Sequence, residues 1–138
     1  MPFEIIRGDI TELNVDAIVN AANPEPVAGY GVDAGIHQKA GPRQLEARKK
    51  LGPIPVGQAA LTRGYDLSAK YVIHAVGPVW ADGSRGEEAL LRRTYDSALA
   101  LAAKKRCGSV AFPLLSSGKN GFPKGAALRI AVSAFIAF

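Results

Sequence analysis

The chain has 138 residues, enough for one domain with a buried core. Its hydrophobic content of 48% and charged content of 21% are those of a globular protein and exclude a disordered one. Basic residues outnumber acidic ones by 17 to 12, and the net charge of +5 favours anionic partners, from nucleic acid to a phosphorylated small molecule.

The predicted strands and helices alternate along the chain. Apolar or alternating runs predict strands at residues 3–6, 16–20, 59–62, 71–76 and 109–113. Apolar residues at helical spacing predict helices over residues 32–40, 43–51, 86–105 and 126–138. Strands that alternate with helices, without repeats or linkers, predict one α/β domain with a mostly parallel sheet.

Two loops each follow an apolar strand and open a helix: "NPEPVAGYG" at 23–31 and "LSSGKNGFP" at 115–123. Loops at the carboxyl ends of strands form the ligand crevice of an open α/β sheet. Helix N-termini offer free N–H groups to phosphate, and glycine lets the backbone approach closely. The pair of loops therefore predicts a diphosphate held from both sides, although glycine-rich loops are also common as simple turns.

Several function classes find no support in the sequence. No apolar run approaches the roughly 20 residues that cross a bilayer, and the amino terminus lacks the pattern of a secretory signal. The single cysteine, Cys107, fits a cytoplasmic location. The basic triplets at 48–50 and 104–106 are interpreted as solvated helix faces. No stripe of aromatic and basic residues is visible, so the sequence does not favour nucleic acid as a partner.

Five motifs, in order, resemble the macro domain family. They are "GDIT" (8–11), "VDAIVNAAN" (15–23), "GVDAGIH" (31–37), "YVIHAVGPVW" (71–80) and "FPLLSSGKNGFP" (112–123). The resemblance runs from about residue 3 to the end and is closest to the MacroD-type hydrolases. It implies a three-layer α/β/α sandwich with a mostly parallel mixed sheet, as a single macro domain over residues 1–138. Macro domains bind ADP-ribose, and some hydrolyse it from acidic side chains or deacetylate O-acetyl-ADP-ribose.

The resemblance also implies roles for individual residues. Asp9, beside the backbone of Ile10, would accept a hydrogen bond from the adenine amino group, or be only a turn residue. Asn23 and Asp33 would be catalytic: Asn23 at the distal ribose, and Asp33 orienting or deprotonating a water or positioning the ribose. The competing interpretation of Asp33 is an acid that stabilises the first turn of a helix. The other implied ligand contacts are Gly29, Tyr30, Gly31, Val32, Ser116, Ser117, Gly118, Lys119 and Asn120.

The remaining polar residues of these motifs are interpreted as structural. Asn20 would tie loop backbone groups together. His37 and His74 would be hydrogen-bonded in or near the core. Neither serine of the second loop is expected to be a nucleophile, and no metal site or cofactor is expected. Catalysis would rest on positioning and on the phosphate of the substrate.

The chain departs from the family pattern at three places. Tyr30 lies in a run that is usually glycine, with Pro24 and Pro26 before it, and Lys119 and Asn120 replace an aliphatic and an aromatic residue. The usual last strand and helix are lacking, which predicts a bare sheet edge. These departures weaken the case for a hydrolase more than the case for a binder, because catalysis tolerates misplacement less well.

The sequence thus predicts an ADP-ribose-binding domain that hydrolyses ADP-ribose from modified side chains or deacetylates O-acetyl-ADP-ribose. The alternative is a non-catalytic ADP-ribose reader. A nucleic-acid or poly-anion binder is a third possibility, supported only by the charge of +5. The expected partners are ADP-ribose or an ADP-ribosylated protein, with no membrane, and the expected state is a monomer.

Overall fold

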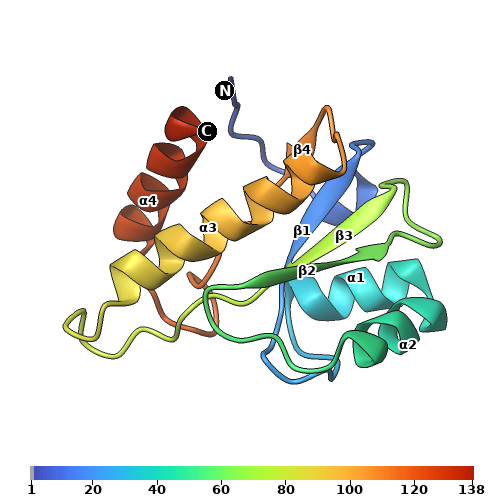
Figure 1. Cartoon of the computed structure of the whole chain (residues 1–138), viewed down its shortest axis with the longest axis horizontal. Helices are drawn as coiled ribbons and strands as arrows, with labels where there is room; N and C mark the ends of the chain where they lie inside the picture. Colours follow the sequence, from blue (N-terminus) through green and yellow to red (C-terminus); the bar gives the residue numbers. More distant parts are fainter. Residues whose placement is uncertain (1) are drawn as a thin grey trace.

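Four strands form the central sheet of the computed structural model, which describes residues 2–138 (Figure 1). They are β1 (Ala17–Ala21), β2 (Ala59–Arg63), β3 (Tyr71–Ala75) and β4 (Val110–Ala111), in the order β2-β3-β1-β4. Strand β1 runs parallel to β3 and β4, whereas β2 is antiparallel to β3. The carboxyl ends of β1 and β3 therefore meet at the same edge of the sheet.

The helices form a layer on each face of the sheet. They are α1 (Val32–Ala40), α2 (Pro42–Leu51), α3 (Glu87–Lys104) and α4 (Lys124–Ala137), with a short 3-10 helix, η1, at Ile10–Glu12. Helices α1 and α2 contact β1 and β2, while α3 contacts β2 and β3 and carries α4 against it (Figure 1). This arrangement confirms the predicted three-layer α/β/α sandwich with a mostly parallel mixed sheet.

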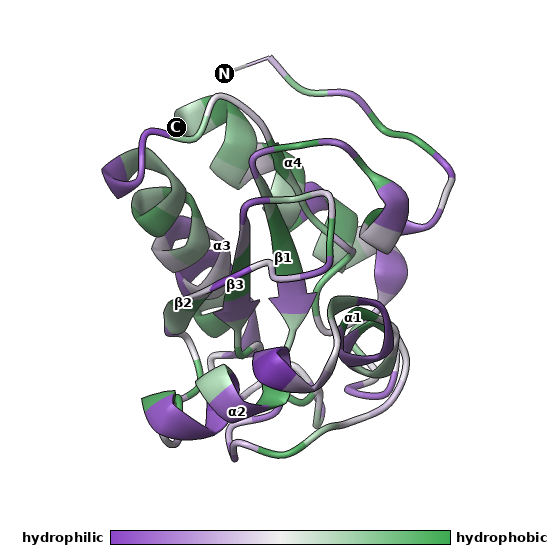
Figure 2. Cartoon of the chain, turned by 90° about the vertical axis from the view of Figure 1, so that its right-hand side faces the viewer, coloured by the Kyte–Doolittle hydropathy of each residue, from purple (hydrophilic) through white to green (hydrophobic). Residues whose placement is uncertain are grey.

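Both faces of the sheet are buried because successive side chains of a strand point to opposite sides. Ile18 and Val72 pack under α1, whereas Val19 and Ile73 join a larger cluster around Tyr95 of α3. Figure 2 shows β1 and β3 as hydrophobic strands enclosed by the helices. A sheet buried on both faces leaves its strand ends as the place where polar side chains gather.

The strand predicted at residues 3–6 is wrong. Residues 3–6 form no strand, and Ile5 and Ile6 are 72% and 57% exposed. A strand requires a hydrogen-bonded neighbour, and none of the four strands in the described residues pairs with this segment. The ring of Phe3 lies 5.7 Å from that of Phe135. The last predicted strand shortens to β4, since Pro113 cannot donate a ladder hydrogen bond.

Candidate functional site

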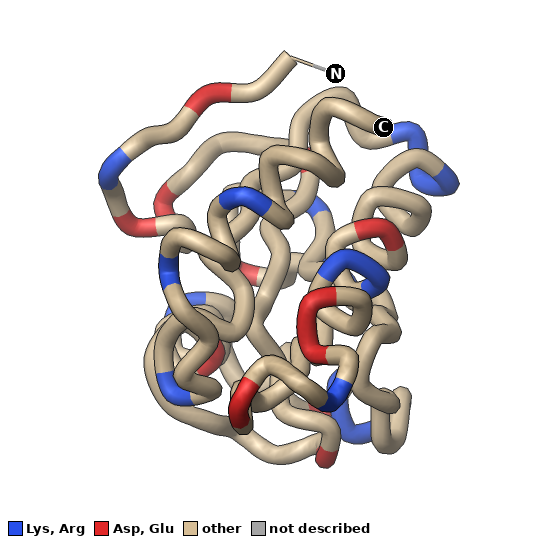
Figure 3. The backbone as a smooth tube through the Cα atoms, turned by 90° about the vertical axis from the view of Figure 1, so that its left-hand side faces the viewer, with Lys and Arg blue, Asp and Glu red and all other residues tan. Residues whose placement is uncertain are grey.

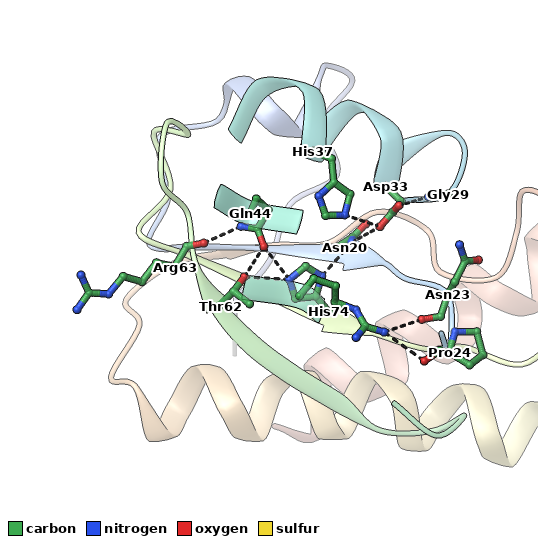
Figure 4. A network of polar contacts seen from close by, with 11 residues as sticks. Asn20, Asn23, Pro24, Gly29, Asp33, His37, Gln44, Thr62, Arg63 and His74 are labelled. Carbon is green, nitrogen blue, oxygen red and sulfur yellow. Dashed lines mark hydrogen bonds and ion pairs between the residues drawn. The ribbon is translucent and has the colours of Figure 1, made fainter. Parts of the chain in front are cut away.

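Asp33, in the first turn of α1, is the centre of a polar network at the carboxyl ends of β1 and β3 (Figure 4). Asn20 near the end of β1 donates to Asp33 Oδ1 at 2.6 Å and to His74 Nδ1 at 3.1 Å. The backbone N–H of Gly29 donates to Asp33 Oδ2. His37 Nε2 lies 3.5 Å from Asp33 Oδ1. Both carboxylate oxygens are therefore held by the surrounding residues.

These neighbours keep Asp33 ionised. Burial acts to raise the pKa of this carboxyl, but His37, the Asn20 amide and the Gly29 N–H together outweigh burial and lower the pKa below 3.8. A carboxylate with a lowered pKa is a poor proton acceptor near neutral pH. Asp33 is thus better suited to fixing the geometry of the loop than to removing a proton.

His74 continues the network across the sheet and is structural, as the sequence predicted. Burial, first, and the nearby charge of Arg48 lower its pKa from 6.5 to about 3, so its ring is neutral at pH 7. Its Nδ1 accepts from Asn20, and its Nε2 lies 2.9 Å from Thr62 Oγ1 and 3.2 Å from Gln44 Oε1. The neutral ring, with its proton on Nε2, fixes which way the Asn20 amide points.

His37 differs from the prediction. Neither ring nitrogen makes a hydrogen bond within residues 2–138, and the ring instead stacks on that of His74 at 6.4 Å. Its Nε2 faces the Asp33 carboxylate. The i, i+4 spacing from Asp33 on α1 produces this contact.

Asn23 and Asp33 approach each other on either side of Gly29. A Cβ placed on Gly29 would clash with Asn23 Nδ2 and would lie 3.3 Å from Asp33 Oδ2. Only glycine fits between these two side chains without moving one of them. Gly31, two residues later, has φ +61° and is the N-cap of α1. It offers no side-chain cap, so the first N–H groups of α1 face this loop without a side-chain partner from the cap residue. The sequence-predicted catalytic pair is therefore brought together at a helix start.

The side chain of Arg48 holds the first loop, residues 23–31, by hydrogen bonds, a role that the sequence interpretation missed. Its side chain is 2% exposed, and its Nη2 donates to the carbonyl oxygens of Asn23 at 3.0 Å and Pro24 at 3.2 Å. The prediction of a solvated helix face at 48–50 is thus wrong at its first residue. Gln44, four residues earlier, is also buried, so the i, i+4 pairing of long polar residues on one helix face was the available signal.

The second loop, residues 115–123, lies at the same end of the sheet. Ser116 has φ +65°, and its buried Oγ has no hydrogen-bond partner among the described residues. Ser117 Oγ donates to Leu114 O at 2.7 Å. Asn120 Nδ2 donates to Gly77 O at 3.3 Å. Among these predicted ligand contacts, Ser117 and Asn120 use their side chains to hold the loop.

Tyr30 and Lys119 connect the two loops at their tips. The Lys119 ammonium lies 5.2 Å from the centre of the Tyr30 ring, and the Tyr30 side chain is 79% exposed. The remaining predicted contacts lie by η1 and α1. Asp9 accepts from the backbone N–H and the hydroxyl of Thr11, as expected of a turn residue, while Ile10 and Val32 pack on the cluster under α1. The second carboxylate oxygen of Asp9 has no partner within residues 2–138, which keeps both interpretations of Asp9 open.

Comparisons with known proteins identify the family. The sequence profile of the Macro domain matches residues 19–131. The chain belongs to the macro domain family. A macro domain-containing protein of Chlorobaculum tepidum is 49% identical over 128 residues, covering 93% of this chain and 74% of the relative. A protein named O-acetyl-ADP-ribose deacetylase from Enterobacter cloacae is 50% identical over 133 residues, covering 94% and 74%.

The fold of this macro domain matches that of solved relatives. The Oceanobacillus iheyensis macrodomain with ADP superposes with a TM-score of 0.91 at 38% identity, covering 95% of this chain and 73% of that one. Structures of its variants replace an asparagine and an aspartate ten positions apart, and a glycine seven positions after that asparagine. Asn23, Asp33 and Tyr30 have the same spacing, since 33 − 23 = 10 and 30 − 23 = 7.

The described part of this macro domain lacks two features. Residues 2–138 hold no group of three His, Cys, Asp or Glu side chains arranged to bind a metal. No helix in the described range is long and apolar enough to cross a membrane.

Proposed function

We propose that this macro domain binds ADP-ribose and hydrolyses an ester at its distal ribose. The bond is either the link to a modified acidic side chain or the acetyl ester of O-acetyl-ADP-ribose. The observation that carries the proposal is the convergence of Asn23, Gly29 and Asp33 at the start of α1. The relative named O-acetyl-ADP-ribose deacetylase supports it, as does the glycine-to-valine variant of the Oceanobacillus macrodomain, whose structure contains ADP-ribose.

The diphosphate binds between the two loops, against the uncapped N-terminus of α1. Positive dipole and free N–H groups at a helix start attract phosphate. The unpaired carboxylate oxygen of Asp9 accepts a hydrogen bond from the adenine amino group. Tyr30 and Lys119 cover the diphosphate from the rim. The solved variant with valine at the position that Tyr30 occupies by spacing supports tolerance of a side chain there.

In the reaction, a water oxygen forms a bond to the electrophilic carbon of the ester, and the C–O bond to the leaving group breaks. Asn23 holds the distal ribose, and Asp33 keeps Gly29 and Asn20 in place. The proton of the water passes to bulk solvent as that bond forms, while the charged Asp33 and the substrate's diphosphate orient the water. The leaving oxygen takes up a proton from solvent. Catalysis then rests on positioning, without a covalent intermediate.

Calorimetric titration with ADP-ribose, with AMP as the control, is the first test. Micromolar binding of ADP-ribose with weaker binding of AMP supports the site. No heat from a folded protein would overturn the proposal.

A turnover assay on ADP-ribosylated protein and on O-acetyl-ADP-ribose tests the chemistry. Release of ADP-ribose or acetate is the expected result. Binding without either product would make the domain a reader, which the departures at Tyr30 and Lys119 favour. Binding by the 138-residue chain itself tests the proposal that residues 1–138 form a single macro domain. Measuring the mass of that chain in solution tests the proposal that it is a monomer.

A further inference from the structure

A pocket of about 430 Å³ lies at the opposite end of the strands from the Asp33 site. We call it the basic pocket; its lining includes Arg43, Arg63, Tyr65 and Lys70. Arg63 pairs in register with Tyr71, the first residue of β3, whereas the Asp33 site lies beyond Ala75, its last. The length of β3 separates them by about 13 Å. The volume is within the range of about 300–1,000 Å³ that small-molecule sites occupy.

The charge of the basic pocket is largely uncompensated. Arg43 Nη2 contacts Asp66 Oδ1 at 3.3 Å, but in the described part of the chain Arg63 and Lys70 have no acidic partner within salt-bridge distance. All three side chains belong to exposed residues. On the side of the molecule seen in Figure 3, by contrast, acidic and basic residues are interspersed. An anionic ligand would supply the charge that the pocket lacks.

Aromatic rings accompany these cations. The Arg43 guanidinium lies 4.9 Å from the centre of the Tyr65 ring, and Lys105 Nζ lies 6.0 Å from that of Tyr71. Tyr65 has φ +52°, a conformation that is uncommon for a bulky residue. The loop that carries it is fixed, since Gly64 N donates to Lys70 O at 2.7 Å and Asp66 N to Ala40 O at 3.2 Å. The loop backbone therefore places Tyr65 beside Arg43 before any ligand arrives.

Exposed cations beside aromatic rings are the arrangement that binds single-stranded nucleic acid. Cations follow the phosphates, and unpaired bases stack on aromatic rings or on arginine planes. An acidic peptide would use the cations but leave the aromatic rings without a partner. In a duplex the bases are paired and stacked on each other, so they could not stack on these rings. These cations and rings come from α2, the end of β2, the β2–β3 loop and the end of α3 (Figure 1). They are far apart in the sequence and come together only in the fold.

We propose that the basic pocket and its neighbour Tyr71–Lys105 form a binding site for single-stranded nucleic acid, separate from the Asp33 site. The sequence alone did not favour nucleic acid as a partner, and this proposal departs from that expectation. The backbone phosphates contact Arg63, Lys70 and Lys105, and a base stacks on the outer face of the Arg43 guanidinium. With about three phosphates engaged, log K should fall with log[salt] with a slope of about −2.

Fluorescence anisotropy with a labelled 12-nucleotide oligouridine tests the site on the intact chain. The double variant Arg63→Ala/Lys70→Ala should bind about tenfold more weakly at 50 mM salt, with a salt slope reduced by about 1.4. The matched control, Lys49→Ala/Lys50→Ala, removes the same charge from the far end of α2 and should stay within about twofold. Circular dichroism checks that both variants are folded.

Excess ADP-ribose and an acidic peptide distinguish this site from the Asp33 site and from a general attraction for anions. ADP-ribose should leave oligouridine bound, and a labelled peptide of twelve glutamates should bind much more weakly than oligouridine. The proposal is overturned if oligouridine does not bind at 50 mM salt, or if both double variants lose affinity equally. It is also overturned if ADP-ribose displaces oligouridine, or if the peptide binds as tightly.

Discussion

At the scale of single residues, Asp33 connects the structure to the proposed chemistry. Its carboxylate holds Gly29 and Asn20, so Asp33→Ala should disorder the loop where we propose that the distal ribose binds. We expect turnover to fall by about 100-fold or more, with ADP-ribose affinity within about tenfold, or 1.4 kcal/mol. Asp66→Ala is the control, because Asp66 is exposed and lies by the basic pocket. Equal turnover by Asp33→Ala and the unchanged protein would remove Asp33 from the mechanism.

Gly29 offers a second test at this scale. Gly29→Ala would push Asn23 or the loop aside, because the added Cβ would clash with Asn23 Nδ2. We expect turnover to fall by about tenfold or more, since misplacement by about an angstrom is costly in catalysis. Gly125→Ala, in the first turn of α4 with open space around its Cβ, should be neutral or stabilising by up to about 1 kcal/mol. Similar turnover by the two variants would argue against a close fit at Gly29.

At the scale of elements, α3 fixes the second loop through Tyr95. The Tyr95 hydroxyl accepts a hydrogen bond from Leu115 N at 3.0 Å, and burial, first of all, raises the pKa of Tyr95 to about 12. Tyr95→Phe would leave this buried N–H unpaired and should lower the free energy of unfolding by about 1–3 kcal/mol. Urea unfolding measures the change, with Tyr30→Phe as the control because its ring is exposed. An unchanged midpoint for Tyr95→Phe would show that water replaces the hydroxyl.

The contact between the loop tips is tested by Lys119→Ala. Removing the ammonium takes away its contact with Tyr30 and its proposed attraction for the diphosphate; the lost attraction alone should weaken ligand binding by about 0.5–1 kcal/mol at an exposed site. We expect ADP-ribose to bind about two- to fivefold more weakly. Lys124→Ala, also exposed and close in sequence, is the control. Equal affinities of the two variants, measured by calorimetry, would show that Lys119 does not contact the ligand.

The elements also show what the sequence could and could not predict. Helix α1 has the predicted bounds, 32–40, because its glycine start and its apolar spacing are local signals. The strand at 3–6 was wrong because alternation reports propensity, whereas pairing depends on a neighbour. Asn23 and Asp33 were predicted from the family motifs. The burial of Arg48 and the cluster at the basic pocket depend on contacts between distant segments, which no local pattern contains.

At the scale of the whole molecule, the polar network through His74 ties stability to pH. The network joins α1, β1, β3, β2 and α2 across one face of the sheet (Figure 4). A neutral His74 is required in its centre, since Nδ1 accepts from Asn20. Protonation would place a second donor against that amide and a charge in a buried site.

The sign of the pH dependence follows from the lowered pKa of His74. Unfolded His74 takes up a proton near pH 6.5, whereas the folded protein takes it up only near pH 3. Between these values the unfolded state binds more protons, so the free energy of unfolding should fall by up to about 1.4 kcal/mol for each pH unit below 6.5. Asp33, whose pKa is below 3.8, adds to the loss only at lower pH.

Urea unfolding at pH 7, 5.5 and 4.5 should therefore give steadily lower midpoints. In NMR spectra over the same range, the ring protons of His74 should not titrate. Constant stability from pH 7 to 4.5, or a His74 that titrates near pH 6, would mean that the ring is hydrated and that the network opens to solvent. The Asn20 amide would then be free to turn, and Asp33 would lose the donor that orients it, so the pH profile of stability also reports on the preorganisation of the site.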